Sequence, residues 1–226
     1  MRSPAAFTHS APAMQTSRIW LFDLDNTLHN AAPHIFPHID RAMMAYIRQH
    51  LAVDEATADH LREHYWQRYG ATLLGLVRHH GTDPVHFLHH THQIPNLEEK
   101  LLAERGLRQM LRHLPGRKYI FSNAPRTYVH RVLSGLGITR CFAGVYCIEH
   151  LRYLPKPQPG AFIRLLHKER LDPRRCIMVE DSLQNLATAK RLGMKTVWVS
   201  TRTRRSPYAD VHISRLSDLP SHLGRL

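Results

Sequence analysis

The chain has 226 residues, of which 43% are hydrophobic and 22% are charged. This length and composition fit one large globular domain or two small ones, and they exclude a disordered or collagen-like protein. The 31 lysines and arginines outnumber the 18 acidic residues, and the resulting net charge of +13 leaves nucleic acid, an anionic membrane surface and small anionic substrates open as partners.

The first 17 residues are rich in Ala, Ser and Pro and contain no continuous apolar stretch. They predict a flexible tail rather than a signal peptide, and Met14 is a second candidate for the start of translation. No run of about 18 apolar residues occurs, so we expect no membrane-spanning helix. Three cysteines without CxxC spacing indicate a reducing, cytoplasmic environment and no disulfide framework.

Residues 19–22, Ile-Trp-Leu-Phe, form a continuous apolar run that is typical of a buried parallel strand. The pattern then changes, because apolar residues recur at intervals of three and four residues. It predicts helices over 39–51, 56–69, 72–79 and 84–92, and a fifth helix over 97–114 before Pro115-Gly116. We therefore expect an all-helical cap, residues 31–114, inserted after the first strand.

Strands and single helices alternate through the rest of the chain. Strands are predicted over 119–121, 144–148, 176–179, 196–199 and 211–213, with helices over 127–136, from Pro159 onward, and over 183–192. Such alternation produces right-handed βαβ units. The sequence thus predicts an α/β fold: an open parallel, Rossmann-like sheet sandwiched by helices, formed by residues 18–30 and 115–226.

Polar side chains follow several of the predicted strands directly. Ligands of open parallel sheets bind beyond the carboxyl ends of the strands, so these side chains are expected at one rim. They are Asp23 and Asp25 after the first strand, Ser122 and Asn123 after 119–121, Glu180 and Asp181 after 176–179, and Lys156 in the loop after 144–148, where two flanking prolines hold the chain extended.

The residue types at this rim suit phosphate chemistry. Closely packed carboxylates raise one another's pKa unless a cation lies between them, and Mg²⁺ is the usual cation for oxygen ligands. A free carboxylate can attack phosphorus and form an aspartyl-phosphate. Lysine and serine can hold a phosphoryl group during its transfer.

Four motifs occur in order: Asp23-x-Asp25-x-Thr27, Ser122-Asn123, Lys156-Pro157 and Glu180-Asp181-Ser182. This series resembles the four motifs of the haloacid dehalogenase superfamily. Residues 21–28, 121–124 and 156–159 look most like the pyrimidine 5'-nucleotidase branch of that superfamily. The resemblance implies Mg²⁺-dependent hydrolysis of a small phosphate ester.

The resemblance also implies roles at the metal and the reacting bond. Asp23 would attack phosphorus while its second oxygen binds Mg²⁺. Asp25 would act as general acid and then general base, and its backbone carbonyl would touch the metal. Glu180 and Asp181 would complete the metal site.

A second group of residues is implied in holding phosphate. Ser122 and nearby backbone amides would bind the phosphoryl oxygens, and Asn123 would be a further phosphate-binding residue. Lys156 would neutralise their charge, and the backbone amide of Asn26 would add a further contact. Ser182 is instead expected as the N-cap of the next helix.

The substrate is expected to be a nucleoside 5'-monophosphate such as UMP or CMP, by resemblance only. Sugar phosphates such as phosphoglycolate are the alternative, since Glu180 stands where the nucleotidase branch often has Asp. An alternative from another class is a basic nucleic-acid-binding protein with a vestigial phosphatase site. The basic residues Arg202, Arg204 and Arg205 lack interleaved aromatic residues, which favours a solvated loop.

The helical insertion carries two further features. The first is a set of six histidines: His79, His80, His86, His89, His90 and His92. No carboxylate or cysteine accompanies them at metal-ligand spacing. We therefore expect a solvated surface, and metal binding is the alternative. The second is the aromatic group Tyr65, Trp66 and Tyr69, expected in the core, where one or two of its members could instead wall a base-binding pocket.

Overall fold

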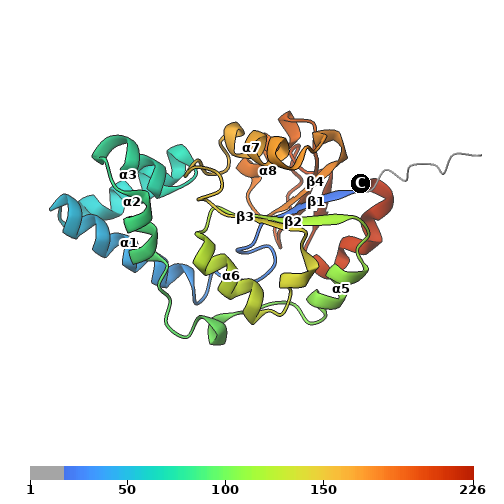
Figure 1. Ribbon diagram of the computed structural model, residues 1–226, viewed down its shortest axis with the longest axis horizontal. Coiled ribbons are helices and arrows are strands. Elements are labelled where there is room, and N and C mark those ends of the chain that lie inside the picture. The colour runs from blue at the N-terminus through green and yellow to red at the C-terminus, as the bar shows by residue number, and fades with distance from the viewer. Residues whose placement is uncertain (1–17) are drawn as a thin grey trace, which may run out of the picture.

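The structure is a computed structural model that describes residues 18–226, so the predicted N-terminal tail lies outside the described residues. Six parallel strands form one sheet in the order β3-β2-β1-β4-β5-β6. They are β1 (Ile19–Phe22), β2 (Arg117–Phe121), β3 (Gly144–Tyr146), β4 (Cys176–Glu180), β5 (Lys195–Val199) and β6 (Val211–Ile213). The predicted α/β fold with an open parallel sheet is confirmed (Figure 1).

Helices cover both faces of the sheet, which explains why β1 is apolar at every position. Ile19 and Leu21 pack in a buried cluster with residues of α7 (Pro159–Glu169) and α8 (Leu183–Arg191). Trp20 and Phe22 point to the other face. There they pack in a cluster with α5 (Leu107–His113), α6 (Arg126–Gly135) and the 3-10 helix η4 (Leu216–Arg225).

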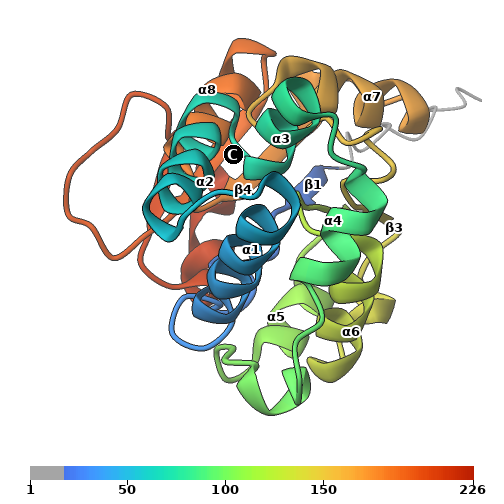
Figure 2. The same cartoon turned by 90° about the vertical axis from the view of Figure 1, so that its left-hand side faces the viewer.

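Four helices between β1 and β2 form a separate group at one end of the molecule (Figures 1 and 2). They are α1 (Phe36–Leu51), α2 (Glu55–Tyr69), α3 (Thr72–His80) and α4 (Pro84–Thr91). Asp54 and Asp83 cap α2 and α4, because their side chains accept backbone N–H groups of the first turn. This cap has its own buried cluster, which includes Tyr46, Ile47 and Phe87 together with Ile148 from the core.

The predicted continuous helix over 97–114 is wrong. The segment consists of a 3-10 helix, η1 (Leu97–Lys100), and the separate helix α5. Between them, the carbonyl of Leu102 accepts the N–H of Asn30, and Gly106 has a φ of 80° that interrupts a helix. Three leucines of this segment pack in the cluster of Trp20 and Phe22: Leu97, Leu107 and Leu111. The two-part division stays a prediction, and this packing favours a cap that ends near Thr91.

Smaller differences concern element ends. The predicted strand 144–148 ends at Tyr146, because the chain then turns and the carbonyl of Cys147 accepts the N–H of His150. Helix α1 starts three residues earlier than the predicted 39–51, at Phe36. Within residues 18–226, no helix is both long and apolar enough to cross a membrane.

Gly70 ends α2 where the cap touches the core. Its φ is 84°, and a Cβ atom added there would lie 2.4 Å from the carbonyl oxygen of Lys156 and 2.2 Å from Cδ of Pro157. Gly81 ends α3 with a φ of 64°, but apart from its two chain neighbours no residue among 18–226 has an atom within 4 Å of its Cβ position. The two glycines are therefore a matched pair that differs in this contact.

We expect Gly70→Ala to lower the free energy of unfolding by about 2–5 kcal/mol, since it adds overpacking to left-handed strain. Gly81→Ala adds the strain alone and should cost about 1–2 kcal/mol. Urea denaturation of both variants measures the difference. Equal losses would contradict the close contact between α2 and the 156–157 loop.

Candidate active site

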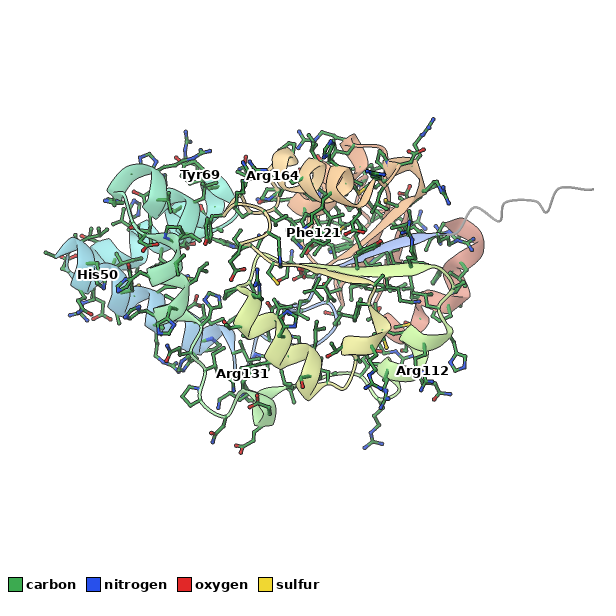
Figure 3. The ribbon with its side chains drawn as sticks, viewed as in Figure 1. His50, Tyr69, Arg112, Phe121, Arg131 and Arg164 are labelled. Atoms are coloured by element: carbon green, nitrogen blue, oxygen red, sulfur yellow. The ribbon has the colours of Figure 1, made fainter. Side chains whose placement is uncertain are left out.

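The candidate site lies at the carboxyl edge of the three central strands. Asp23 follows β1, Ser122 follows β2 and Glu180 ends β4, and β2 and β4 flank β1 in the sheet. The loop after β3 brings Lys156 to the same edge. Phe121, the last residue of β2, lies at the end of the sheet that faces the cap (Figure 3). The predicted rim is therefore assembled from four chain segments.

Lys156 is the centre of this assembly, and only 1% of its surface is exposed. Its Nζ donates to Oδ1 of Asp23 at 2.8 Å and to Oε2 of Glu180 at 2.7 Å. Its backbone N–H donates to Oδ1 of Asn123, and its carbonyl accepts from Nδ2 of the same residue. Asn123 thus uses its side chain to hold Lys156, and its contact with phosphate stays a prediction.

Asp23, Glu180 and Asp181 form an acidic cluster in which one carboxylate oxygen of each lies within 4.8 Å of the others. Burial, followed by the charge of Glu180, raises the pKa of Asp23 to about 7. Burial also raises the pKa of Glu180 to about 7 and that of Asp181 to about 6. Burial lowers the pKa of Lys156, but the two acids bonded to it outweigh this effect and raise it above its usual value.

The donor set of this cluster fits a divalent metal ion. Three carboxylates lie together with one lysine, which pairs with Asp23 and Glu180, so their combined charge when ionised exceeds the charge that Lys156 neutralises. Burial is the largest cause of the raised pKa values of the three acids, and repulsion between the carboxylates adds to it. Carboxylate oxygens are the ligands that Mg²⁺ prefers, and a charge of +2 matches the excess.

Asp25 lies beside the acidic cluster, but its carboxyl is held elsewhere. Its Oδ1 accepts the hydroxyl of Tyr128 at 2.5 Å and lies 2.9 Å from Nε2 of His29. The predicted metal contact of Asp25 through its backbone carbonyl stays a prediction. The separation leaves the Asp25 carboxyl available for proton transfer.

Side-chain hydrogen bonds fix the turn after β1 and the start of the loop after β2. Asn26 has a φ of 60°, and its Oδ1 accepts the N–H groups of Ala31 and Ala32, both at 3.1 Å. The hydroxyl of Thr27 donates to Oδ2 of Asp23 at 3.1 Å. Oγ of Ser122 accepts the N–H of Ala124 at 3.1 Å.

A cavity of about 490 Å³ joins this rim to the cap. Asp23, Asp25, Ser122 and Lys156 line its floor, and Trp66 lines its cap side. Trp66 is 59% exposed, whereas its predicted partners Tyr65 and Tyr69 are buried in the cap cluster. Of the three aromatics considered for a pocket wall, Trp66 is therefore the one that faces the cavity.

Comparison with known proteins agrees with this geometry. The sequence model of the haloacid dehalogenase-like hydrolases matches residues 18–193. The chain belongs to this hydrolase family. The phosphoglycolate phosphatase of Colwellia psychrerythraea is 25% identical over 200 residues, which cover 81% of this chain and 84% of that protein.

Phosphate metabolism protein 8 of Saccharomyces cerevisiae is 26% identical over 194 residues, or 78% of this chain. The aligned part spans only 60% of that relative. The crystal structure of a phosphatase of the same family from Thermococcus onnurineus superposes with a TM-score of 0.62 at 24% identity, covering 92% of this chain and 98% of that one. This likeness shows the fold that the hydrolase family shares.

Within the hydrolase fold, the histidine-rich cap surface is predicted correctly except at one position. Five of the six histidines are exposed, but His92 lines the cavity. It follows α4, where the chain turns toward α6, and its ring centroid lies 5.9 Å from that of Tyr128. Burial lowers the pKa of His92 to about 4, so it is neutral near pH 7.

Two further predictions concern residues outside the acidic cluster. Arg202, Arg204 and Arg205 are exposed in the loop between β5 and β6, as predicted, and this loop projects to one side in Figure 2. Ser182 is the N-cap residue of α8, although its side chain makes no capping bond.

Sequence reasoning did not assign a role to three residues that bond Asp23 or Asp25: Thr27, His29 and Tyr128. Thr27 belongs to the first motif, and this could have identified it. Tyr128 lies 103 residues from Asp25, and no spacing connects the two before the chain folds.

Stabilisation by Mg²⁺ should depend on pH. Because the folded-state pKa values of Asp23 and Glu180 lie above their unfolded values, the metal-free protein loses stability as pH rises from about 4 toward 7. Mg²⁺ competes with these protons. Its effect on Tm should therefore be small at pH 5.5 and grow toward pH 8.

Thermal unfolding with Mg²⁺ or EDTA across this pH range measures the effect. Glu180→Gln should weaken the growth of the Mg²⁺-induced Tm increase with pH, because one carboxyl at which protons and Mg²⁺ compete is lost. A Tm increase that is the same at every pH would contradict metal binding at the acidic cluster.

Proposed function

We propose that the protein is a Mg²⁺-dependent phosphomonoesterase that acts through an aspartyl-phosphate on Asp23. The observation that carries this proposal is that Asp23, bonded to Lys156, and the separately held Asp25 line one cavity. A nucleophile, a charge-neutralising cation and a proton donor are the parts that this reaction needs.

In the first half-reaction, a carboxylate oxygen of Asp23 attacks phosphorus. The bond between phosphorus and the ester oxygen breaks, and the departing alkoxide takes a proton from Asp25. In the second half-reaction, Asp25 takes a proton from water, which attacks the aspartyl-phosphate. Inorganic phosphate leaves, and both aspartates return to their starting states.

The other residues stabilise charge during these steps. Lys156 is protonated and hydrogen-bonded to Asp23, so it neutralises charge on the transferring phosphoryl group. Ser122 lines the same cavity and can donate its hydroxyl to a phosphoryl oxygen. Mg²⁺ held by Asp23, Glu180 and Asp181 would supply further positive charge at those oxygens.

The hydrolase family takes its name from dehalogenation, and Asp25 separates the two reactions. A halide leaves without a proton, whereas an alkoxide needs one. The Asp25 carboxyl is fixed by two hydrogen-bonding groups within reach of the cavity. This supports an ester oxygen, rather than a halogen, as the leaving group.

The cap side of the cavity supports a nucleoside 5'-monophosphate as the substrate. It includes the apolar side chains of Met43, Trp66 and Phe87, which suit a base more than a short acid. Arg62 is its cationic residue, and this guanidinium is already paired with Asp40 and Asp59. The pyrimidine preference comes from the sequence resemblance.

Phosphoglycolate is the second candidate. Its support is the relative from Colwellia psychrerythraea, which is a phosphoglycolate phosphatase, and Glu180 at the metal site. A binding protein for nucleic acid is the remaining alternative. In that case the positive charge would carry the function, and binding would fall steeply with salt.

A panel of phosphate esters separates these candidates. We expect phosphate release that requires Mg²⁺ and stops with EDTA, with UMP or CMP ahead of phosphoglycolate. Trp66→Ala should raise KM for nucleotides by about tenfold, because a base loses a stacking contact of about 1–3 kcal/mol. It should leave phosphoglycolate hydrolysis unchanged.

Faster phosphate release from phosphoglycolate than from UMP or CMP, unaffected by Trp66→Ala, would support the proposed mechanism but contradict a nucleotide as the substrate. No phosphate release by the folded protein from any ester of the panel would contradict the phosphatase proposal.

The nucleophile is tested by Asp23→Asn, which should reduce turnover below detection and remove any phosphoenzyme, because an amide is a poor nucleophile. Ser122→Ala should lower kcat by about 10²–10³-fold through loss of one hydroxyl donor. Asp218→Asn, at an acid of η4 that pairs with Arg215, serves as the control. Phosphate release and acid-quenched labelling are the measurements, and substantial hydrolysis by Asp23→Asn would disprove the assignment.

A further inference from the structure

One oxygen of Asp25 is held by two buried rings from different parts of the chain. Tyr128 of α6 is 1% exposed, and its hydroxyl donates to Oδ1. The side chain of His29 is fully buried, and its Nε2 lies 2.9 Å from the same oxygen. The Asp25 side chain itself remains 16% exposed at the cavity.

The hydrogen-bond network fixes the direction of both contacts. Burial, together with the charge of Asp25, raises the pKa of Tyr128, so the phenol keeps its proton and donates it. Oδ1 therefore acts as an acceptor, which assigns the proton of His29 to Nε2. Two donors then converge on one carboxyl oxygen.

His29 also carries a feature that packing alone does not explain. Its Nδ1 is buried, and within residues 18–226 it has no hydrogen-bond partner. An unpartnered buried nitrogen lowers stability, and an apolar side chain of similar size would avoid this loss. The compensating contact of the ring is the one to Asp25.

We propose that His29 and Tyr128 are positioning residues for proton transfer by Asp25, an inference that rests on the proposed phosphatase function. By occupying Oδ1 as donors, they direct the transferable proton to Oδ2. That proton moves from Oδ2 to the ester oxygen as its bond to phosphorus breaks and the bond between Asp23 and phosphorus forms. Neither ring contacts the substrate in this role.

The leaving group gives a readout that separates this role from a structural one. An alkyl phosphate such as a nucleotide releases a strongly basic alkoxide and needs the proton. p-Nitrophenyl phosphate releases a weakly basic phenolate and needs it little. Since kcat/KM covers the steps up to departure of the leaving group, loss of positioning should lower this ratio selectively for alkyl phosphates.

The experiment compares kcat/KM for UMP, or for phosphoglycolate if that is the better substrate, with kcat/KM for p-nitrophenyl phosphate. In Tyr128→Phe and His29→Leu we expect about a 10–100-fold loss for the alkyl ester and less than about a threefold loss for the aryl ester. His29→Gln can place an amide N–H near Oδ1 and should recover part of the alkyl activity.

Tyr119→Phe is the matched control, because Tyr119 is also buried and its hydroxyl donates to Glu169 at 3.0 Å. Tyr119→Phe should leave kcat/KM unchanged for both the alkyl and the aryl ester. Equal losses for both esters, or no loss for either, would overturn the positioning role while hydrolysis by the unmutated protein upholds the proposed function. Absence of hydrolysis by the unmutated protein would overturn the function, and this inference with it.

Discussion

The buried ammonium group of Lys156 is the contact on which the rest of the site depends. It joins an acid that follows β1 to an acid at the end of β4 at the edge of the sheet. Removal of one member of such a buried set leaves uncompensated charge, at a cost of about 3–5 kcal/mol. The surroundings hold the lysine loop accordingly: Asn123 bonds its backbone, Thr188 of α8 donates to the carbonyl of Pro157, and Gln158 donates to the carbonyl of Tyr69.

The topology places the acidic cluster and the cap side of the cavity on different chain segments. Parallel strands end at one edge of the sheet. The residues that follow β1, β2 and β4 therefore meet there, although these three segments are far apart in the sequence. Helices α1–α4 contribute no member of the acidic cluster and instead line the opposite side of the cavity. The acidic cluster and the opposite wall of the cavity are thus carried by different parts of the chain.

Much of this arrangement could be predicted from the sequence, because its signals are local. The apolar run of β1, the three- and four-residue periodicity of α1–α4 and the polar residues after β1, β2 and β4 are all signals carried by neighbouring residues. The prediction of one continuous helix over 97–114 is wrong because tertiary contacts override the periodicity of this segment. The carbonyl of Leu102 accepts the N–H of Asn30, and Gly106 takes a positive φ. The contact of Tyr128 with Asp25, and the place of His92 in the cavity, depend on packing between distant helices and leave no mark in residue spacing.

The loop before Lys156 belongs to two structural units at once. Ile148 is buried in the cap cluster, and Tyr153 and Leu154 pack against it, yet Lys156, two residues later, is bonded to the acids of the sheet. Local unfolding of α1–α4 would therefore loosen the 148–154 segment first, while Lys156 stays bonded to Asp23, Glu180 and Asn123. Amide exchange in this segment should then follow exchange in α1–α4 rather than exchange in the central strands.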